Sequence, residues 1–377
     1  MCNPWTNSIV IPFFKIKFHI KKMIRKNAKW FVIIIMLAFT VPFLIRACGT
    51  DIGHDPDTGT VVEDTLPKID IPSFNADSAY NFTDKIVGMS PRVVGTEGAR
   101  KVKAYLIEQF KKYGADVVEQ PFDVKTFDGK SHKATNIVAR MNLQATKRVL
   151  LSAHWDSRPF ADSKEETDAT QRNKPILGAD DSGSAVAMLI EMTRQLQAHP
   201  LSNLGVDIVL FDAEDYGDTT KARPLTEAQA NAQNKTWALG SQYWSAKPHV
   251  AGYKAAYGIN LDMAGAQSAR FPRESNSQKY APSIVAKVWR VANFHGFGNY
   301  FVNESSSFPM LDDHLYVNEV AKIPMVDIIN NPTETAGFGK YWHTHNDNMS
   351  IIDKNTLKAV GQTVLSVLHY ENAKAFD

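Results

Sequence analysis

The sequence predicts an α/β fold: a single domain with a central mixed, mostly parallel β-sheet flanked by helices on both faces. Short apolar segments typical of buried strands alternate along the chain with longer segments whose apolar residues recur at helical spacing. Polar clusters directly follow several predicted strands, and ligands bind at this end of the strands in such sheets. The apolar content of 44% and the charged content of 22% are ordinary for a protein with a hydrophobic core.

Residues 1–48 are predicted to form an N-terminal signal or membrane-anchor segment. Basic residues precede an uninterrupted apolar run over residues 30–45, as in a secretion signal. This run is short for a membrane-spanning helix, which needs about 20 residues. Cys48 follows Ala47, which resembles a bacterial lipoprotein processing site, although Arg46 departs from that pattern. Lipidation of Cys48 and an uncleaved signal anchor are both open, and each predicts a membrane-tethered domain outside the cytoplasm.

Residues 49–74 are predicted to be a linker, because Gly, Pro, Asp and Thr occur there with little periodicity. A single folded domain is then expected over residues 75–377. Both cysteines, Cys2 and Cys48, precede this domain, so a metal within it must be bound by His, Asp and Glu. The net charge of +2 gives no indication of a nucleic-acid partner.

Within this domain, apolar residues at helical spacing predict helices over residues 76–89, 96–113, 184–197, 282–293 and 355–371. Apolar and β-branched runs predict strands over residues 117–124, 135–141, 148–153, 206–211, 255–261 and 324–329. The motifs HWD, AED and DMAG follow the third, fourth and fifth of these strands. Because the carboxyl ends of parallel strands meet at one edge of a sheet, these motifs are expected to lie together.

Several clusters of His and carboxylate side chains are candidates for a metal site. Without cysteine, this set suits zinc, which binds His nitrogen and carboxylate oxygen and keeps one position open in catalytic sites. Each cluster alone is a weak signal, since a pair of acids beside Ser-Gly is more often a helix cap than a metal ligand. The candidates are His154, Asp156, Asp180, Asp181, Glu214, Asp215, Asp262, Asp312, Asp313, His314, His343, His345 and Asp347.

The motifs HWDS, GADDSGSA, FDAED, LDMAG and WHT, in this order, resemble the zinc aminopeptidase superfamily, which also contains the glutaminyl cyclases. The resemblance extends from Ala76 to the C-terminus. Two-zinc aminopeptidases of this superfamily use five ligands, and every matching position is filled. These positions are His154, Asp181, Asp215, Asp262 and His343. A two-zinc aminopeptidase is therefore the alternative that the ligand set leaves open.

Three motifs favour the glutaminyl cyclases within this superfamily. WHTHNDN is similar to the cyclase pattern WHT-x-x-DN, LDDHL to the cyclase DDH segment, and AHWDSR to the cyclase H-aromatic-DS segment. The resemblance implies one zinc ion per chain, bound by Asp181, Asp215 and His343, with Asp181 favoured over its neighbour Asp180. Animal cyclases have Glu where this chain has Asp215, so the chain is similar to the bacterial form of the family.

The resemblance also implies the reaction: N-terminal glutamine of a peptide or protein is converted to pyroglutamate, and ammonia is released. Zinc polarises the γ-carboxamide, and Glu214 moves a proton from the attacking amine to the leaving ammonia. Asp262 and Asp312 are expected to hold the amine and to orient Glu214. Trp342 is expected to wall the substrate pocket, together with Trp237 as a second aromatic residue.

The expected partners are peptide substrates with N-terminal Gln and, through the N-terminal anchor, a membrane. The expected location is the bacterial cell envelope, facing the periplasm. The polar insertion over residues 163–175 is expected to form a loop at the rim of the site. The sequence does not indicate an oligomeric state.

Overall fold

The computed structural model describes residues 66–220, 225–306, 308–331 and 337–376. The predicted signal or anchor segment, residues 1–48, and most of the predicted linker, residues 49–74, therefore lie outside the described residues. Within the described part of the chain, no helix combines the length and apolar character needed to cross a membrane. Leu66 and Phe74, which precede the first described helix, are both buried in the hydrophobic core.

A six-stranded sheet of order β1-β2-β4-β3-β5-β8 forms the centre of the described domain. β3, β4, β5 and β8 run parallel to one another, whereas β2 is antiparallel to both β1 and β4. The predicted mixed, mostly parallel sheet is confirmed, and each of the six predicted strands is present. The strands are β1 (Asp116–Lys125), β2 (Ser131–Met141), β3 (Arg148–His154), β4 (Gly205–Phe211), β5 (Tyr257–Asp262) and β8 (Met325–Ile329).

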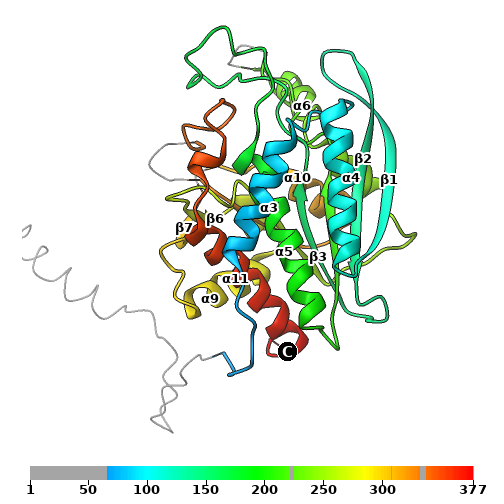
Figure 1. Ribbon diagram of the computed structural model, residues 1–377, viewed down its shortest axis with the longest axis vertical. Coiled ribbons are helices and arrows are strands. Elements are labelled where there is room, and N and C mark those ends of the chain that lie inside the picture. Colours follow the sequence, from blue (N-terminus) through cyan, green and yellow to red (C-terminus); the bar gives the residue numbers. More distant parts are fainter. Residues whose placement is uncertain (1–65, 221–224, 307, 332–336, 377) are drawn as a thin grey trace, which may run out of the picture. The chain divides into compact units, whose positions relative to one another are not determined.

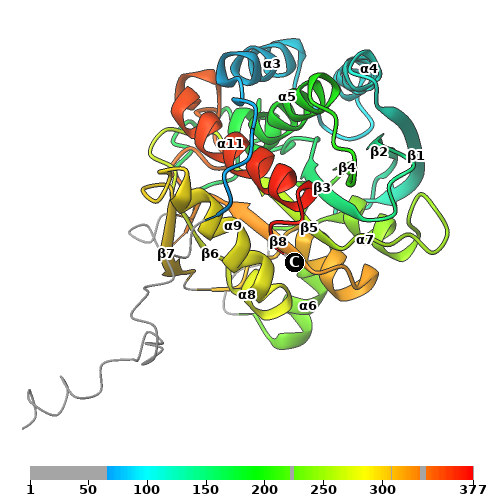
Figure 2. The same ribbon diagram turned by 90° about the horizontal axis from the view of Figure 1, so that it is seen from below.

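Helices cover both faces of this sheet, as predicted (Figures 1 and 2). One face is covered by α3 (Ala76–Met89), α4 (Glu97–Lys112), α5 (Ala185–Ala198) and α11 (Lys354–Asn372). The opposite face carries α7 (Leu239–Ala246) and the helical turn Val317–Ala321. Helix α9 (Pro282–Phe294) packs against α11, so all five predicted helices are present.

Alternating side chains of the central strands supply two hydrophobic clusters, one on each face. Leu151 of β3 and Ile208 of β4 belong to the large cluster under α3, α4, α5 and α11. Their chain neighbours Leu150 and Val209 belong to the smaller cluster that contains Trp244 of α7. Successive side chains of a strand point to opposite faces, so a sheet covered on both sides needs uninterrupted apolar strands. The continuous apolar runs in the sequence therefore reflect burial on both faces.

Several short elements between β4 and β8 are absent from the sequence-based prediction. They are α6 (Glu227–Asn234), α7, β6 (Phe271–Arg273), α8 (Ser275–Tyr280), β7 (Phe301–Ser305) and α10 (Asp313–Tyr316). β6 and β7 pair with each other in a separate two-stranded sheet. Helix α7 begins after Ala238, which has a φ of 54° and offers no capping side chain. The usual Ser, Thr, Asp or Asn start signal is therefore missing there.

Candidate metal centre and active site

The carboxyl ends of the parallel strands bring the predicted site residues together. His154 is the last residue of β3, Asp262 is the last residue of β5, and Asp215 lies in the loop after β4. Asp181 lies in the helical turn Ala179–Ser184 that precedes α5, and His343 comes from the segment between β8 and α11. The expected convergence of the motifs at one edge of the sheet is therefore observed.

Asp181, Asp215 and His343 form a buried group whose ligand atoms lie within 4.8 Å of one another. His343 Nε2 lies 3.0 Å from Asp215 Oδ1 and 3.7 Å from Asp181 Oδ2. Burial raises the pKa of Asp215, and the charge of Asp181 raises it further. Asp215 Oδ2 is buried and has no hydrogen-bond partner among the described residues. A bound cation would satisfy this oxygen, and one nitrogen with two carboxylates is a donor set that suits zinc.

A second group of possible ligands overlaps the first through a shared residue. His154, Asp181 and Asp262 offer ligand atoms that also lie within 4.8 Å of one another. His154 Nε2 lies 2.9 Å from Asp181 Oδ1 and 3.3 Å from Asp262 Oδ1. Because Asp181 belongs to both groups, its two oxygens could bridge a pair of ions. The geometry of the five positions therefore accommodates both a one-ion and a two-ion centre.

Two of the candidate ligands, Asp156 and Asp347, have another role in the structure. Asp156 accepts the backbone N–H groups of Glu214 at 3.0 Å and Asp215 at 3.1 Å. Asp347 accepts those of Asp180 at 2.8 Å and Asp181 at 3.2 Å. Both carboxylates are buried. They fix the two loops that supply the carboxylate ligands, and they belong to neither overlapping group of possible ligands.

Asp162 is a functional candidate that the sequence analysis missed. Its Oδ1 lies 3.2 Å from His343 Nδ1, and its two oxygens accept hydrogen bonds from Arg158 at 3.1 and 2.5 Å. Burial raises the pKa of Asp162, but His343 and Arg158 outweigh burial and hold it well below the usual value. The contact is an ion pair without the geometry of an ordinary hydrogen bond. It lies on the Nδ1 side of the imidazole, while Nε2 faces Asp215 and Asp181, and carboxylates behind metal-binding imidazoles commonly orient the ring. The only sequence signal was an Arg four residues before an Asp.

Two tryptophans flank the His343 ring. Trp342 stacks on it with a centroid distance of 3.6 Å, and Trp237 lies nearly parallel to it at 6.1 Å. The Arg158 guanidinium lies 4.7 Å from the centroid of the Trp237 ring. Both tryptophans line the pocket over the metal group, together with Met263, Met310, Ile329 and Phe338. The structure thus places Trp237 and Trp342 at the pocket, where the sequence analysis expected them.

The three acids predicted to act on the substrate line this same pocket. Burial raises the pKa of Glu214 well above its usual range, although the charge of His154 opposes this. Burial also raises the pKa of Asp262 to about 7. Asp312 caps α10, and its Oδ2 accepts a hydrogen bond from Asn260 at 2.7 Å. A buried carboxyl with a raised pKa can both accept and donate a proton near neutral pH.

Two other candidates lie outside the pocket. Asp180 is already satisfied, because it accepts hydrogen bonds from the Tyr341 hydroxyl and the Gly265 N–H, both at 2.7 Å. This agrees with the preference for Asp181 over Asp180. His345 Nδ1 lies 3.0 Å from Glu166 in the polar insertion, so this insertion contacts the segment that carries His343.

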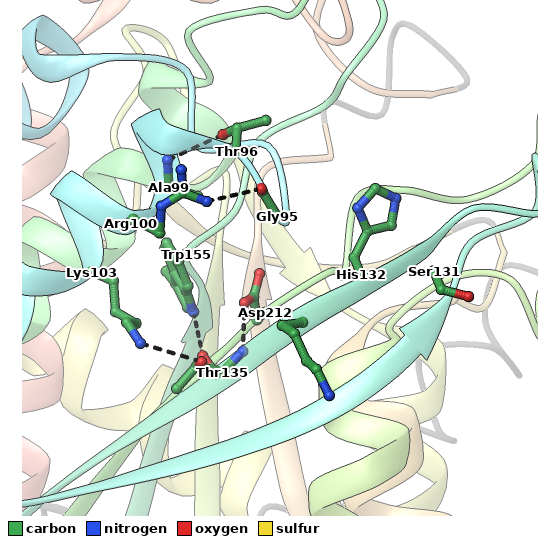
Figure 3. Close-up of a pocket in the computed structure, with 11 residues that line it drawn as sticks. Gly95, Thr96, Ala99, Arg100, Lys103, Ser131, His132, Thr135, Trp155 and Asp212 are labelled. Atoms are coloured by element: carbon green, nitrogen blue, oxygen red, sulfur yellow. Dashed lines mark hydrogen bonds between the residues drawn. The ribbon is translucent and has the colours of Figure 1, made fainter.

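A larger pocket of about 330 Å³ is lined by Asp212 and residues of α4, β2 and β3 or near them (Figure 3). Thr135 is tied there to three neighbours: its carbonyl accepts from Trp155, its hydroxyl from Lys103, and its N–H donates to Asp212. This pocket contains none of the predicted metal-binding or catalytic residues. The candidate active site is therefore the smaller, acid-rich pocket over His343.

Several known proteins are similar to this chain in sequence, and two of them also in structure. A glutaminyl cyclase from Bacteroides thetaiotaomicron, solved with N-acetylhistamine, is 43% identical; the match covers 80% of this chain and 99% of that one, with a TM-score of 0.74. A zinc-dependent exopeptidase from Parabacteroides distasonis is 42% identical over 79% of this chain and 99% of its own, with a TM-score of 0.74. A glutaminyl-peptide cyclotransferase from Drosophila melanogaster is 28% identical over 72% of this chain and 74% of that protein.

The match to a protein family covers most of the described domain. The sequence pattern of peptidase family M28 matches residues 136–368. This range contains every residue of the two overlapping ligand groups and the pocket acids. The family pattern matches more than half of the chain, and the chain covers 99% of a solved relative. The chain therefore belongs to peptidase family M28.

Proposed function

We propose that this protein is a zinc-dependent glutaminyl-peptide cyclotransferase, which converts N-terminal glutamine of peptides into pyroglutamate and releases ammonia. The observation that carries the proposal is the arrangement of one pocket. There, Glu214, Asp262 and Asp312 face the metal group formed by Asp181, Asp215 and His343. The 43% identity to a bacterial glutaminyl cyclase, over nearly its whole length, supports this reaction among those known in the family.

The metal is proposed to be one zinc ion per chain, held by Asp181, Asp215 and His343. When bound, zinc supplies a Lewis acid that polarises the γ-carbonyl oxygen of the substrate glutamine. Asp162 supports this role, because it holds the Nδ1 side of His343 and leaves Nε2 free to face the ion. The stacked ring of Trp342 limits the rotation of the His343 imidazole.

The remaining chemistry is a proton transfer within the pocket. The α-amine of the substrate attacks the γ-carbon, a carbon–nitrogen bond forms, and the carboxamide nitrogen leaves as ammonia. Glu214 accepts a proton from the amine and donates it to the leaving nitrogen, which its raised pKa permits in both directions. Asp262 and Asp312 hold the amine beside Glu214. No nucleophile from the protein is needed, because the substrate supplies its own.

A two-zinc aminopeptidase is the second candidate function. The second ligand group, His154, Asp181 and Asp262, favours it, since it lies where a further ion could share Asp181. The similarity to a zinc-dependent exopeptidase is equally extensive. The two functions differ in what Asp262 and His154 do: in the cyclase they stay free of metal, and in the aminopeptidase they are ligands.

The first prediction separates these two functions. The purified protein should contain one zinc ion per chain by elemental analysis. It should remove one ammonia from a peptide that begins with Gln, as seen by mass spectrometry, and leave a Leu-initiated peptide intact. Two ions per chain together with release of free leucine would contradict the cyclase and support the aminopeptidase.

The second prediction concerns Glu214. Glu214→Gln should lower kcat by about 10²- to 10⁴-fold, because the amide cannot carry the proton. Zinc content should stay at the wild-type level, because Glu214 is not a proposed ligand. The matched control is Glu108→Gln on the exposed side of α4, which should leave both kcat and zinc content unchanged. Loss of zinc in Glu214→Gln would instead identify Glu214 as a ligand.

The third prediction concerns Asp162. Asp162→Asn should weaken zinc binding by about tenfold or more, because the charge that fixes His343 is lost. Competition with a colorimetric chelator measures this affinity without relying on turnover. Asp168→Asn, an exposed acid in the same loop region, serves as the control and should bind zinc like the wild type. An unchanged zinc affinity in Asp162→Asn would show that the contact with His343 is dispensable.

We also propose that the N-terminal segment, residues 1–48, holds the catalytic domain at a bacterial envelope membrane, facing the periplasm. The basic residues, the apolar run and Cys48 support this proposal. The wild-type protein should sediment with membranes after cell lysis. Incorporation of a labelled fatty acid that is lost in Cys48→Ser would identify a lipid anchor, whereas membrane association without label would indicate a signal anchor. A wild-type protein found only in the soluble fraction would contradict both.

A further inference from the structure

A buried group of titratable side chains lies next to Asp312. His314 is fully buried at its centre. His314 Nε2 lies 3.1 Å from Glu274 Oε2, and His314 Nδ1 lies 3.5 Å from Asp327 Oδ2 and 3.8 Å from Asp312 Oδ2. The acids come from separate elements: Glu274 caps α8, Asp327 lies in β8, and Asp312 caps α10. A single imidazole thus contacts three acids.

Glu274 fixes the Nε2 side of this imidazole. Its two oxygens accept the backbone N–H groups of Asn276, Ser277 and Met310 at 2.8, 2.6 and 2.9 Å. Burial raises the pKa of Glu274, but His314 and these backbone donors outweigh burial and lower it to about 2. Glu274 is therefore a fixed anion, and it requires a proton on Nε2 of His314.

The Nδ1 side of His314 faces the other two acids. His314 Nδ1 and Asp327 Oδ2 are both buried and, among the described residues, have no hydrogen bond of ordinary geometry. Asn260 Nδ2 donates to Asp312 at 2.7 Å and to Asp327 at 3.1 Å, which holds the two carboxyls beside each other. A second proton, on Nδ1, places the positive charge of the imidazolium against these carboxyls. Unpaired buried charge is costly, so the cation and the acids stabilise each other.

We propose that His314 is a positioning residue for the cyclisation: its imidazolium keeps Asp312 ionised and turned toward the substrate amine. The inference rests on the proposed function, because Asp312 acts on the amine only in that reaction. Burial alone raises the pKa of Asp312. The imidazole of His314 opposes burial most strongly, and together with the backbone N–H of Asp313 and the side chain of Asp327 it leaves the pKa below its usual value. Asp262, Asp313, Asp327 and Glu214 are the acids around Asp312. The imidazole of His154 acts on Asp262, Asp313 and Glu214, whereas the imidazole of His314 contacts Asp312 itself.

The test is the pH dependence of turnover in zinc-loaded His314→Gln, with a Gln-initiated peptide as substrate. Without the imidazolium, the pKa of Asp312 rises, so a higher pH is needed to ionise it. We expect the acid limb of the kcat/KM profile to move upward by about one pH unit or more, which is about a tenfold loss below the limb. Activity should recover as the pH rises. Asp312→Asn should show no such recovery, because an amide does not ionise.

Two further variants complete the experiment. His295→Gln replaces a half-buried imidazole at the end of α9 and should leave the profile unchanged. Glu274→Gln keeps an oxygen for the backbone donors but removes the anion that stabilises the imidazolium. Glu274→Gln should move the acid limb in the same direction by a smaller amount. If His314→Gln does not fold, the pH profile of Glu274→Gln is used to test the inference instead. Thermal unfolding and zinc content are measured on each sample.

Three results would overturn the inference. The first is a folded, zinc-loaded His314→Gln variant whose acid limb lies at the same pH as in the wild type. His314 would then have no electrostatic role, whether turnover is normal or reduced at every pH. Asp312, His314 and Asp327 also lie close enough together to hold a metal ion. If the wild type contained more than one zinc ion per chain and His314→Gln contained fewer, this group would be a metal site instead. A wild-type protein that releases no ammonia overturns the proposed function itself, and this inference with it.

Discussion

The metal group depends on two buried carboxylates, Asp156 and Asp347, that accept pairs of backbone N–H groups. Asp156 holds the loop that presents Glu214 and Asp215, and Asp347 holds the turn that presents Asp181. Hydrogen bonds to a charged group contribute about 1.5–3 kcal/mol each, more than neutral ones. These bonds hold several acids close together although their charges repel one another. The candidate ligands are therefore held in place by hydrogen bonds within the protein.

The surplus of buried acid is offset by a small number of buried cations. The Arg92 guanidinium donates to the carbonyls of Trp155, Leu177 and Gly178, which fixes the chain on both sides of the site. Arg158 holds Asp162 through two hydrogen bonds. Burying charge is unfavourable unless the charge is paired or hydrogen-bonded. Arg158 is paired with Asp162, and Arg92 is hydrogen-bonded to backbone carbonyls. The pocket itself keeps unpaired acid, which is where a metal ion and a substrate amine are expected to bind.

Family M28 shows how one scaffold accommodates two kinds of chemistry. Five ligand positions are filled in this chain, and Asp181 is shared between two overlapping groups. A fold of this kind does not determine the reaction; the site does. Here the determining features are the aromatic rings around His343 and the network that holds Asp312. The rings and Asp312 line the same pocket as Glu214, which is the arrangement on which the proposed cyclisation rests.

The sequence by itself determined the order of the five longer helices and of the six strands of the central sheet, and the edge of the sheet at which the site lies. Those features follow from local periodicity and from the direction of parallel strands, so neighbouring residues suffice to predict them. The tertiary structure alone decided that Asp156 and Asp347 bind backbone N–H groups and that Asp162 supports His343. Asp347 meets Asp180 across 167 positions of the chain, and no local pattern encodes such a contact. A carboxylate can bind a cation or an N–H group equally well, and only the fold determines which of them is near.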